Sequence, residues 1–228
     1  MLETRVDLVN WKPVPAPDPI SLRGRYATLE ALDGIRHGAD LWEATKGHDE
    51  LWTWLPGSPA SDRAAMMESV ERWRQAEHAV LFAISPIETG RAVGWASYMR
   101  INPVHGVIEV GNILFSPALQ RTRAATEAMY LMARHVFDDL GYRRYEWKCN
   151  AENAPSRRAA LRLGFTFEGI FRQHMVVKGR NRDTAWFSML DHEWPAHRQA
   201  FEAWLEPENF DDAGRQRRTL STIAAGRS

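Results

Sequence analysis

Residues 109–128 have the sequence EVGNILFSPALQRTRAATEA, and this stretch indicates the fold class more clearly than any other. Residues 107–115 are apolar at most positions on both faces, as in a central strand of a sheet. Ser116 and Pro117 end that strand, because proline has no N–H to donate to a neighbouring strand. An alanine-rich helix follows at once, so a buried strand leads through a short loop into a helix N-terminus.

A helix that starts in this way can hold an anionic ligand. The first N–H groups of a helix are unpaired and lie at the positive end of its dipole, which suits a pyrophosphate. The small side chains of Ala124 and Ala125 allow close approach, and Arg121 and Arg123 add positive charge. Taken alone, these residues leave a second interpretation open, a helix capped by arginines that contact only solvent.

Helix-like and strand-like segments continue on both sides of this stretch. Spacing of apolar residues predicts strands over 21–29, 79–85, 92–101, 107–115, 143–149, 165–172 and 173–190, the last with a turn near 179–181. It predicts helices over 32–45, 61–77, 121–140, 153–163 and 197–205. The order predicts an α/β domain with a mixed sheet. We expect residues 1–20 to be an extended, proline-rich lead-in, residues 21–192 to be the domain, and residues 193–228 to be a helix and a mobile polar tail.

Composition excludes several classes of protein. The 29 basic and 29 acidic residues balance, whereas a nucleic-acid-binding protein of this size normally has a basic excess. Cys149 is the only cysteine, no apolar run approaches the roughly 18 residues of a membrane helix, and the N-terminus does not resemble a secretory signal. We therefore expect a cytoplasmic protein with no nucleic-acid or membrane partner. The eight histidines lack metal-ligand spacing, so no metal site is expected. A homodimer is expected only on base rates.

A second segment gives residues 109–128 a more specific meaning. Asn153 and Ser156 follow the strand at 143–149, and Leu163-Gly164-Phe165 closes the next helix. Together the two segments resemble the GNAT superfamily of acetyltransferases, and within it the RimJ/RimL-like branch. That branch has Gln-Gly-Lys-Gly-Tyr-Ala-Thr-Glu-Ala where residues 120–128 stand here. The resemblance covers roughly residues 20–192.

The resemblance implies a fold and an activity. The fold is a GNAT-type mixed, mostly antiparallel central sheet flanked by helices. The activity is transfer of an acetyl group from acetyl-CoA, without a metal, by direct attack of a primary amine of a small molecule or a protein N-terminus. A non-catalytic acyl-CoA-binding sensor or scaffold is the alternative from another class of function.

The resemblance also assigns roles to residues. Glu109 is the candidate general base, with a purely structural carboxylate as the alternative, and Ser156 is the candidate proton donor, with helix capping as the alternative. The cofactor is expected to contact Ile113, Leu114, Phe115, Gln120, Arg121, Thr122, Arg123, Ala124, Ala125, Thr126, Asn153 and Ser156. Trp52, Trp54, His105 and His174 are candidates for the acceptor site, although core or surface positions would also suit them.

Two departures from the family pattern affect the mechanism. Arg121 and Arg123 stand where the family usually has glycines, so guanidinium contacts are expected to share in holding the phosphates. Ala160 stands where many members have a tyrosine that protonates the leaving thiolate. Tyrosine catalysis from that position is therefore excluded.

Overall fold

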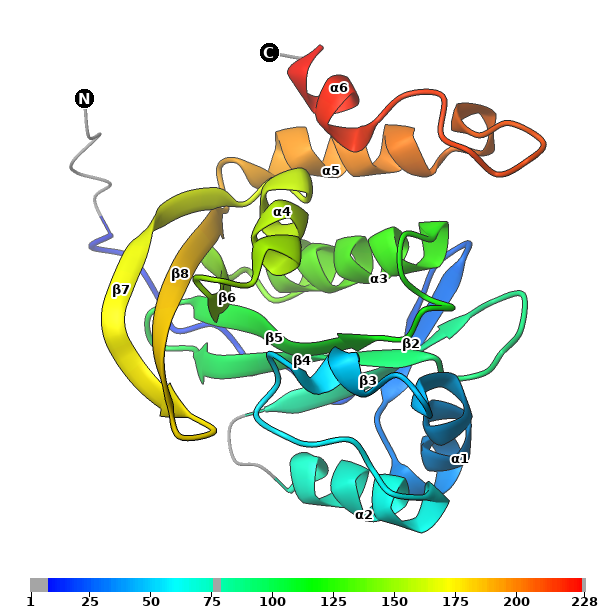
Figure 1. Cartoon of the computed structure of the whole chain (residues 1–228). Helices are drawn as coiled ribbons and strands as arrows, with labels where there is room; N and C mark the ends of the chain where they lie inside the picture. Colours follow the sequence, from blue (N-terminus) through cyan, green and yellow to red (C-terminus); the bar gives the residue numbers. More distant parts are fainter. Residues whose placement is uncertain (1–7, 76–78, 227–228) are drawn as a thin grey trace.

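The computed structural model describes residues 8–75 and 79–226, with one eight-stranded sheet at its centre (Figure 1). The strands are β1 (Leu22–Arg23), β2 (Ala27–Ala31), β3 (Val80–Pro86), β4 (Gly94–Asn102), β5 (Val107–Phe115), β6 (Arg144–Asn150), β7 (Thr166–Val177) and β8 (Arg180–Leu190). Their order is β1-β2-β3-β4-β5-β6-β8-β7, and among the described strand pairs β5–β6 alone is parallel. The predicted mixed, mostly antiparallel sheet is confirmed.

Helices cover both faces of this sheet. They are α1 (Gly34–Thr45), α2 (Arg63–Arg74), α3 (Arg123–Arg134), α4 (Ala154–Arg162), α5 (Trp194–Leu205) and α6 (Leu220–Ala225), with short turns η1 (Asp49–Trp52), η2 (His135–Asp139) and η3 (Pro207–Asn209). The first two lie on one face, and α3 to α6 lie on the other (Figure 1). Each face therefore has its own apolar core, the larger one beneath α3 and the smaller beneath α1 and α2.

Side-chain caps set where the helices begin. Asp33, Asp62, Thr122 and Asn153 each accept a backbone N–H from the residue three positions later, at 2.9, 2.8, 3.0 and 3.1 Å. Such a cap satisfies an N–H that has no partner inside the helix. Asp62 and Asn153 lie at the starts of the helices predicted over 61–77 and 153–163. The predicted end of α2 falls at residues 76–78, which lie outside the described residues, as do residues 1–7 of the expected lead-in.

The key irregularity of the sheet lies in β5. It pairs with β6 only from Val107 to Val110, whereas its pairing with β4 continues to Phe115. Between Gly111 and Leu114, two residues of β5 oppose one of β4, and Asn112 has a φ of 48°. Such a bulge bends a strand and increases its twist. The edge of β5 at residues 111–115 therefore diverges from β6 and has no strand partner there.

Glu127 joins α3 to the hairpin between β1 and β2. Its buried carboxylate accepts the backbone N–H groups of Arg25, Tyr26 and Ala27 at 2.8, 2.5 and 2.7 Å. Gly24 packs against the same carboxylate, because a Cβ there would lie 2.3 Å from the carboxyl carbon of Glu127. Three converging N–H groups form a concave anion site, which the protein fills with its own side chain.

Two predicted boundaries differ from the structure. The helix expected over 121–140 ends as α3 at Arg134 and continues as the π-helical turn η2. The strands expected over 165–172 and 173–190 are β7 and β8, because β7 runs on to Val177 and the chain reverses at residues 178–179. Hydrophobic spacing predicted both elements, but local hydrogen bonding decides where each one ends.

The C-terminal residues pack on the domain beyond the expected helix. Tyr26 donates its hydroxyl to the carbonyl of Leu205 at 3.0 Å, which joins the end of α5 to the start of β2. Where the sequence predicts a mobile polar tail, the structure has α6, and its Leu220 and Ile223 are buried. Two apolar side chains in a polar stretch gave too weak a pattern to predict this packing.

Candidate functional site

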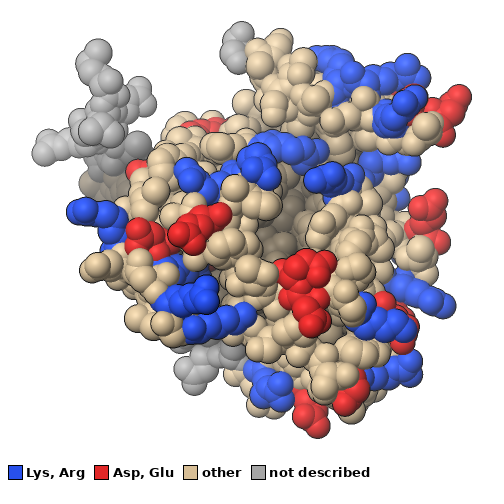
Figure 2. All heavy atoms as spheres, in the orientation of Figure 1, with Lys and Arg blue, Asp and Glu red and all other residues tan. Residues whose placement is uncertain are grey.

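A cavity of about 1770 Å³ lies where β5 and β6 diverge. Its lining residues come from both faces of the sheet, with the N-terminal ends of α3 and α4 on one side and β7, β8 and the residues around η1 on the other. Figure 2 shows a hollow with Lys and Arg along its upper rim and Asp and Glu directly below it. The two ends of the cavity thus differ in charge at their openings.

Every residue predicted to contact the cofactor lines this cavity. They are Ile113, Leu114, Phe115, Gln120, Arg121, Thr122, Arg123, Ala124, Ala125, Thr126, Asn153 and Ser156. The first three belong to the unpaired edge of β5, so their main-chain groups can bond an extended ligand as a neighbouring strand would. The others surround the N-termini of α3 and α4, where a helix dipole favours negative charge.

The loop before α3 keeps a glycine-like backbone. Arg121 has a φ of 61°, in the left-handed region that glycine adopts without steric cost. The side chain of Gln120 donates to the carbonyl of Phe115 at 2.9 Å, and the hydroxyl of Thr122 donates to that of Leu119 at 2.7 Å. The arginine that replaces a family glycine thus retains the conformation of the turn.

Aromatic rings hold the arginines of this end. The guanidinium of Arg123 lies between the rings of Tyr26 and Phe210, 4.8 and 4.7 Å from their centroids. That of Arg162 lies 5.1 Å from the ring of Trp204 and donates to the hydroxyl of Thr126 at 3.2 Å. The rings of Trp204 and Phe210 both come from the C-terminal segment, residues 193–226.

These guanidinium groups have no internal counter-charge. Arg121, Arg123, Arg158 and Arg162 line the cavity, and no carboxylate in the described part of the chain forms an ion pair with any of them. Burial lowers the pKa of Arg162. Four cations without a carboxylate partner on the wall of one cavity fit a ligand with several phosphate charges.

Ser156 lies at the start of α4 within a small polar cluster. Its hydroxyl oxygen accepts the indole N–H of Trp147 at 3.0 Å, and its own N–H is capped by Asn153. Burial raises the pKa of the Cys149 thiol, opposed by a hydrogen bond from Ser156. The Ser156 side chain thus contacts Trp147 and Cys149, and its hydroxyl would have to turn from Cys149 to donate to another sulfur atom. Ala160 is fully buried.

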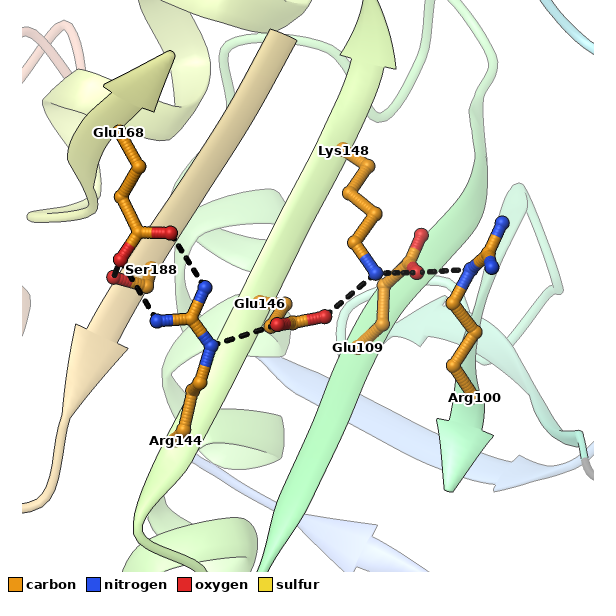
Figure 3. A network of polar contacts seen from close by, with 7 residues as sticks. All are labelled: Arg100, Glu109, Arg144, Glu146, Lys148, Glu168 and Ser188. Carbon is orange, nitrogen blue, oxygen red and sulfur yellow. Dashed lines mark hydrogen bonds and ion pairs between the residues drawn. The ribbon is translucent and has the colours of Figure 1, made fainter. Parts of the chain in front are cut away.

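Glu109 lies in the middle of a chain of charges across the sheet (Figure 3). Its Oε2 is 2.9 Å from Nε of Arg100 and 3.1 Å from Nζ of Lys148. Lys148 is 4% exposed, lies 2.6 Å from Glu146, and has its Nζ 3.7 Å from the ring centroid of Trp186. Burial raises the pKa of Glu109, and Lys148 and Arg100 oppose that rise. This carboxyl can therefore exchange a proton closer to neutral pH than an ordinary glutamate.

The four candidate acceptor residues divide into two pairs. Trp54 and His174 line the cavity, and Nδ1 of His174 lies 2.9 Å from the hydroxyl of Thr184. Trp52 does not line it, because η1 turns its ring into the core beneath α1 and α2, where it is 6% exposed. His105 is exposed on the turn between β4 and β5, away from the cavity wall. Trp52 and His105 are therefore corrected to core and surface positions.

Three cations on the acceptor side of the cavity were not predicted from the sequence. They are Arg100, Lys148 and Arg182, and all of them line the cavity. A signal for Lys148 exists in β6, where Arg144, Glu146 and Lys148 alternate with Tyr145, Trp147 and Cys149. A charged face on an interior strand is unusual, and it lies in register with Glu109 of β5.

Two kinds of feature are absent from the described residues. Within 8–75 and 79–226, no helix has both the length and the apolar character needed to cross a bilayer. The same residues contain no group of three or more His, Cys, Asp and Glu side chains placed to hold a metal ion.

Known proteins with similar sequences and structures provide independent information. Residues 30–166 match the family model described as an acetyltransferase (GNAT) domain. The crystal structure of a GCN5-related N-acetyltransferase from Brucella melitensis is 50% identical, with a TM-score of 0.92 over 95% of this chain and 99% of that one. The uncharacterized N-acetyltransferase p20 of Bacillus licheniformis is 30% identical over 137 residues, 60% of this chain and 75% of p20.

A relative with a more specific name matches a shorter stretch. The ribosomal-protein-serine acetyltransferase of Escherichia coli is 31% identical over 81 residues, which is 36% of this chain and 45% of that protein. The chain is therefore similar, over less than half of its length, to a protein of the RimJ/RimL-like branch, which residues 120–128 and 153–165 resemble.

Proposed function

This chain belongs to the GNAT acetyltransferase family, and from that premise we propose that it transfers an acetyl group from acetyl-CoA to a primary amine. One observation supports the cofactor most strongly. The unpaired edge of β5, the N-terminus of α3 and four guanidinium groups without counter-charges share a single cavity. An extended ligand with amide groups at one end and phosphates at the other matches that combination.

Each part of the cavity has a role in this proposal. The main chain at residues 113–115 bonds the pantetheine amides, and Asn153 assists from the start of α4. The N-terminus of α3, with Arg121, binds the pyrophosphate. Arg123 and Arg162, held by aromatic rings, supply positive potential to the same region. A backbone N–H of the β5 edge is also placed to polarise the thioester carbonyl.

The chemical step needs one base and one acid. Glu109 accepts a proton from the acceptor ammonium, and the free amine attacks the thioester carbon. A C–N bond forms and the C–S bond breaks; Ser156 donates a proton to the leaving sulfur, and the second proton of the attacking nitrogen is released through water to restore the Ser156 hydroxyl, which leaves a neutral amide and a free thiol. Ser156 suits this role because its oxygen accepts from Trp147 and its hydroxyl already lies within hydrogen-bond reach of a sulfur atom, that of Cys149, from which it can turn to the leaving thiolate.

The first experiment separates an enzyme from an acyl-CoA sensor. A ligand that binds only the native state at about 100 times its Kd adds about 2.7 kcal/mol of stability. We expect acetyl-CoA to raise Tm and a panel of amines to release free thiol. A rise in Tm without thiol release from any amine would favour the sensor, and an unchanged Tm would contradict the cofactor assignment itself.

Asn153→Ala tests the contact of the Asn153 side chain with the cofactor. Its loss is expected to weaken acetyl-CoA binding, because Asn153 both caps α4 and faces the cavity. Asn153→Asp keeps the cap and tests the second role alone. Affinity equal to wild type in both variants would remove Asn153 from the cofactor site.

A further inference from the structure

The charges at the acceptor end of the cavity balance, with one exception. Arg100, Lys148 and Arg144 alternate with Glu109, Glu146 and Glu168 in a continuous chain of ion pairs (Figure 3). Arg144 contacts both carboxylate oxygens of Glu168, at 2.7 and 2.5 Å. Each cation in the chain thus has a carboxylate of its own, and each carboxylate has a cation.

Arg182 is the cation outside this chain. It lies on β8 opposite Met175 of β7, and it lines the cavity. Its Nε is buried without a hydrogen-bond partner, and no carboxylate among residues 8–75 and 79–226 forms an ion pair with it. Arg182 as a whole is partly exposed to the cavity, and a guanidinium without a carboxylate partner there can bind an anion supplied from outside.

Most of the other charged groups near Arg182 are already paired, so none of them is free to pair with it. Burial lowers the pKa of His174, and the charges of Arg100, Arg182 and Lys148 lower it further. His174 is therefore neutral near pH 7 and adds no charge, while three cations stand around it. Two carboxylates line this side of the cavity: Glu109, which is already paired twice, and the exposed Glu50 of η1, which lies 3.2 Å from Nδ1 of His48. Among the described cations on this side, Arg182 is the one without a carboxylate of its own.

The same end is also narrowed by a cross-link between distant segments. Nζ of Lys178, at the turn between β7 and β8, donates to the carbonyl of Trp52 at 2.8 Å. This contact joins the hairpin to the residues after η1, whose Trp54 and Leu55 supply an apolar wall. A compact acceptor fits such an enclosure better than an open polypeptide surface.

We propose that Arg182 binds a carboxylate of the acceptor, so that the substrate is a small amine that also bears an acidic group, as in an amino acid. This inference rests on the proposed acetyl transfer. Glu109 meets the ammonium and Arg182 meets the carboxylate, which fixes the orientation of the acceptor toward the thioester.

Matched acceptors test the charge directly. Each free amino acid is compared with its carboxamide, which has the same shape without the charge, for leucine, phenylalanine, β-alanine and 4-aminobutyrate. The kcat/KM for thiol release from acetyl-CoA is expected to favour the best carboxylate over its amide by about 30-fold or more, as for a buried charge pair.

Two substitutions on β8 locate the effect. Arg182→Gln is expected to abolish the preference for the carboxylate, and its rise in Tm with acetyl-CoA, compared with that of wild type, reports that the variant is folded. Arg180→Gln makes the same charge change at an exposed position of the same strand that does not line the cavity. It is expected to retain the preference in full.

Several outcomes would overturn this proposal. Equal rates with carboxylates and amides would do so, as would a preference that survives Arg182→Gln; both leave acetyl transfer intact. Binding is tested separately on protein saturated with CoA, so that absence of turnover does not hide the answer. If no carboxylate raises Tm more than its amide there, the inference fails. An Arg182-dependent preference for succinyl-CoA over acetyl-CoA would place the carboxylate on the donor and overturn its assignment to the acceptor.

Discussion

Glu109 combines burial with two ion pairs, and these have opposite effects on its proton affinity. Desolvation raises the pKa of the carboxyl, whereas Lys148 and Arg100 lower it. The net rise means that the base becomes protonated as pH falls through a value above that of an ordinary glutamate. The acid side of the pH–rate profile should therefore report Glu109.

Glu109→Gln tests that assignment. The variant cannot take up a proton, so it is expected to lose about 10²- to 10⁴-fold in kcat/KM above the pKa of Glu109. The deficit should shrink as pH falls, because wild type loses its base there as well. Glu146→Gln is the matched control, since Glu146 contacts Lys148 but does not line the cavity. It should keep the acid limb and move it to lower pH, because Glu146 raises the pKa of Glu109. An unchanged limb in Glu109→Gln would remove this residue from the mechanism.

Arg121 offers a test in which stability and affinity change differently. A left-handed backbone costs a non-glycine residue about 1–2 kcal/mol, and glycine costs about 0.5–1 kcal/mol in chain entropy. We expect Arg121→Gly to leave Tm unchanged or slightly higher while acetyl-CoA binding weakens. Arg121→Ala removes the same charge without relieving the backbone and should be the less stable of the two. A clear fall in Tm for the glycine variant would mean that the Arg121 side chain stabilises the fold.

The residues that sequence reasoning placed at helix starts and on the edge of β5 do line the cavity, whereas three cations on other strand positions were not predicted. Positions such as Asn153 and Arg121 belong to local motifs whose spacing is visible along the chain. Lys148 and Arg182 depend on which strands become neighbours, and that is decided by the whole sheet. Trp52 was misplaced for the same reason, because the rotation of η1 decides which of two nearby tryptophans faces inward.

At the scale of elements, the start of α3 is fixed by a contact within the protein that needs no ligand. Glu127 binds three N–H groups of the β1–β2 turn, and Gly24 leaves room for its carboxylate. The helix N-terminus that faces the cavity is thereby fixed relative to the sheet. A loss of this contact should therefore affect both folding and cofactor binding.

Glu127→Gln and Gly24→Ala should report the same contact. The first removes the charge that three donors share, and we expect a loss of about 3 kcal/mol in the free energy of unfolding, measured by denaturant. The second pushes the carboxylate away and should cost a comparable amount. Because both act on one contact, the double variant should be much less destabilised than the sum. Gly57→Ala, with a nearest contact of 3.4 Å, is the control. Additive losses would show that the two residues act separately.

The elements themselves were largely predictable, and the reasons differ. Residues 107–115 were predicted with the bounds of β5 because a strand buried on both faces is continuous in its apolar character. The bulge inside that strand was not predicted, since Asn112 has no local signal that separates it from an ordinary strand residue. Yet the bulge opens the cavity.

At the scale of the molecule, the C-terminal segment forms one wall of the cofactor end. Trp204 and Phe210 come from beyond the residues that match the family model, and their rings hold Arg162 and Arg123. Polar content predicted mobility for the end of this segment. Its packing depends on surfaces offered by α3 and α4, which the segment's own sequence does not reveal.

Phe210→Ala tests this wall. It removes one of the two rings around Arg123, and we expect the Kd for acetyl-CoA to rise about 3- to 10-fold, in line with the loss of one cation–π contact. Calorimetric titration well below Tm separates this effect from a loss of stability. Phe210→Leu keeps bulk without the ring and should lie between. Ile35→Ala, exposed on α1, should bind as wild type does. Unchanged affinity in Phe210→Ala would limit the segment to a structural role.

The divergence of β5 from β6 also has a kinetic consequence. The cavity is lined from both faces of the sheet, by α3 and α4 on one and by β7 and β8 on the other, so we expect the cofactor and the acceptor to approach from different sides. The two substrates can then enter by separate routes and meet inside, and each product can depart by the route its precursor used. Neither substrate then blocks the binding of the other. Turnover should therefore proceed through a ternary complex, without an order of binding imposed by a shared entrance.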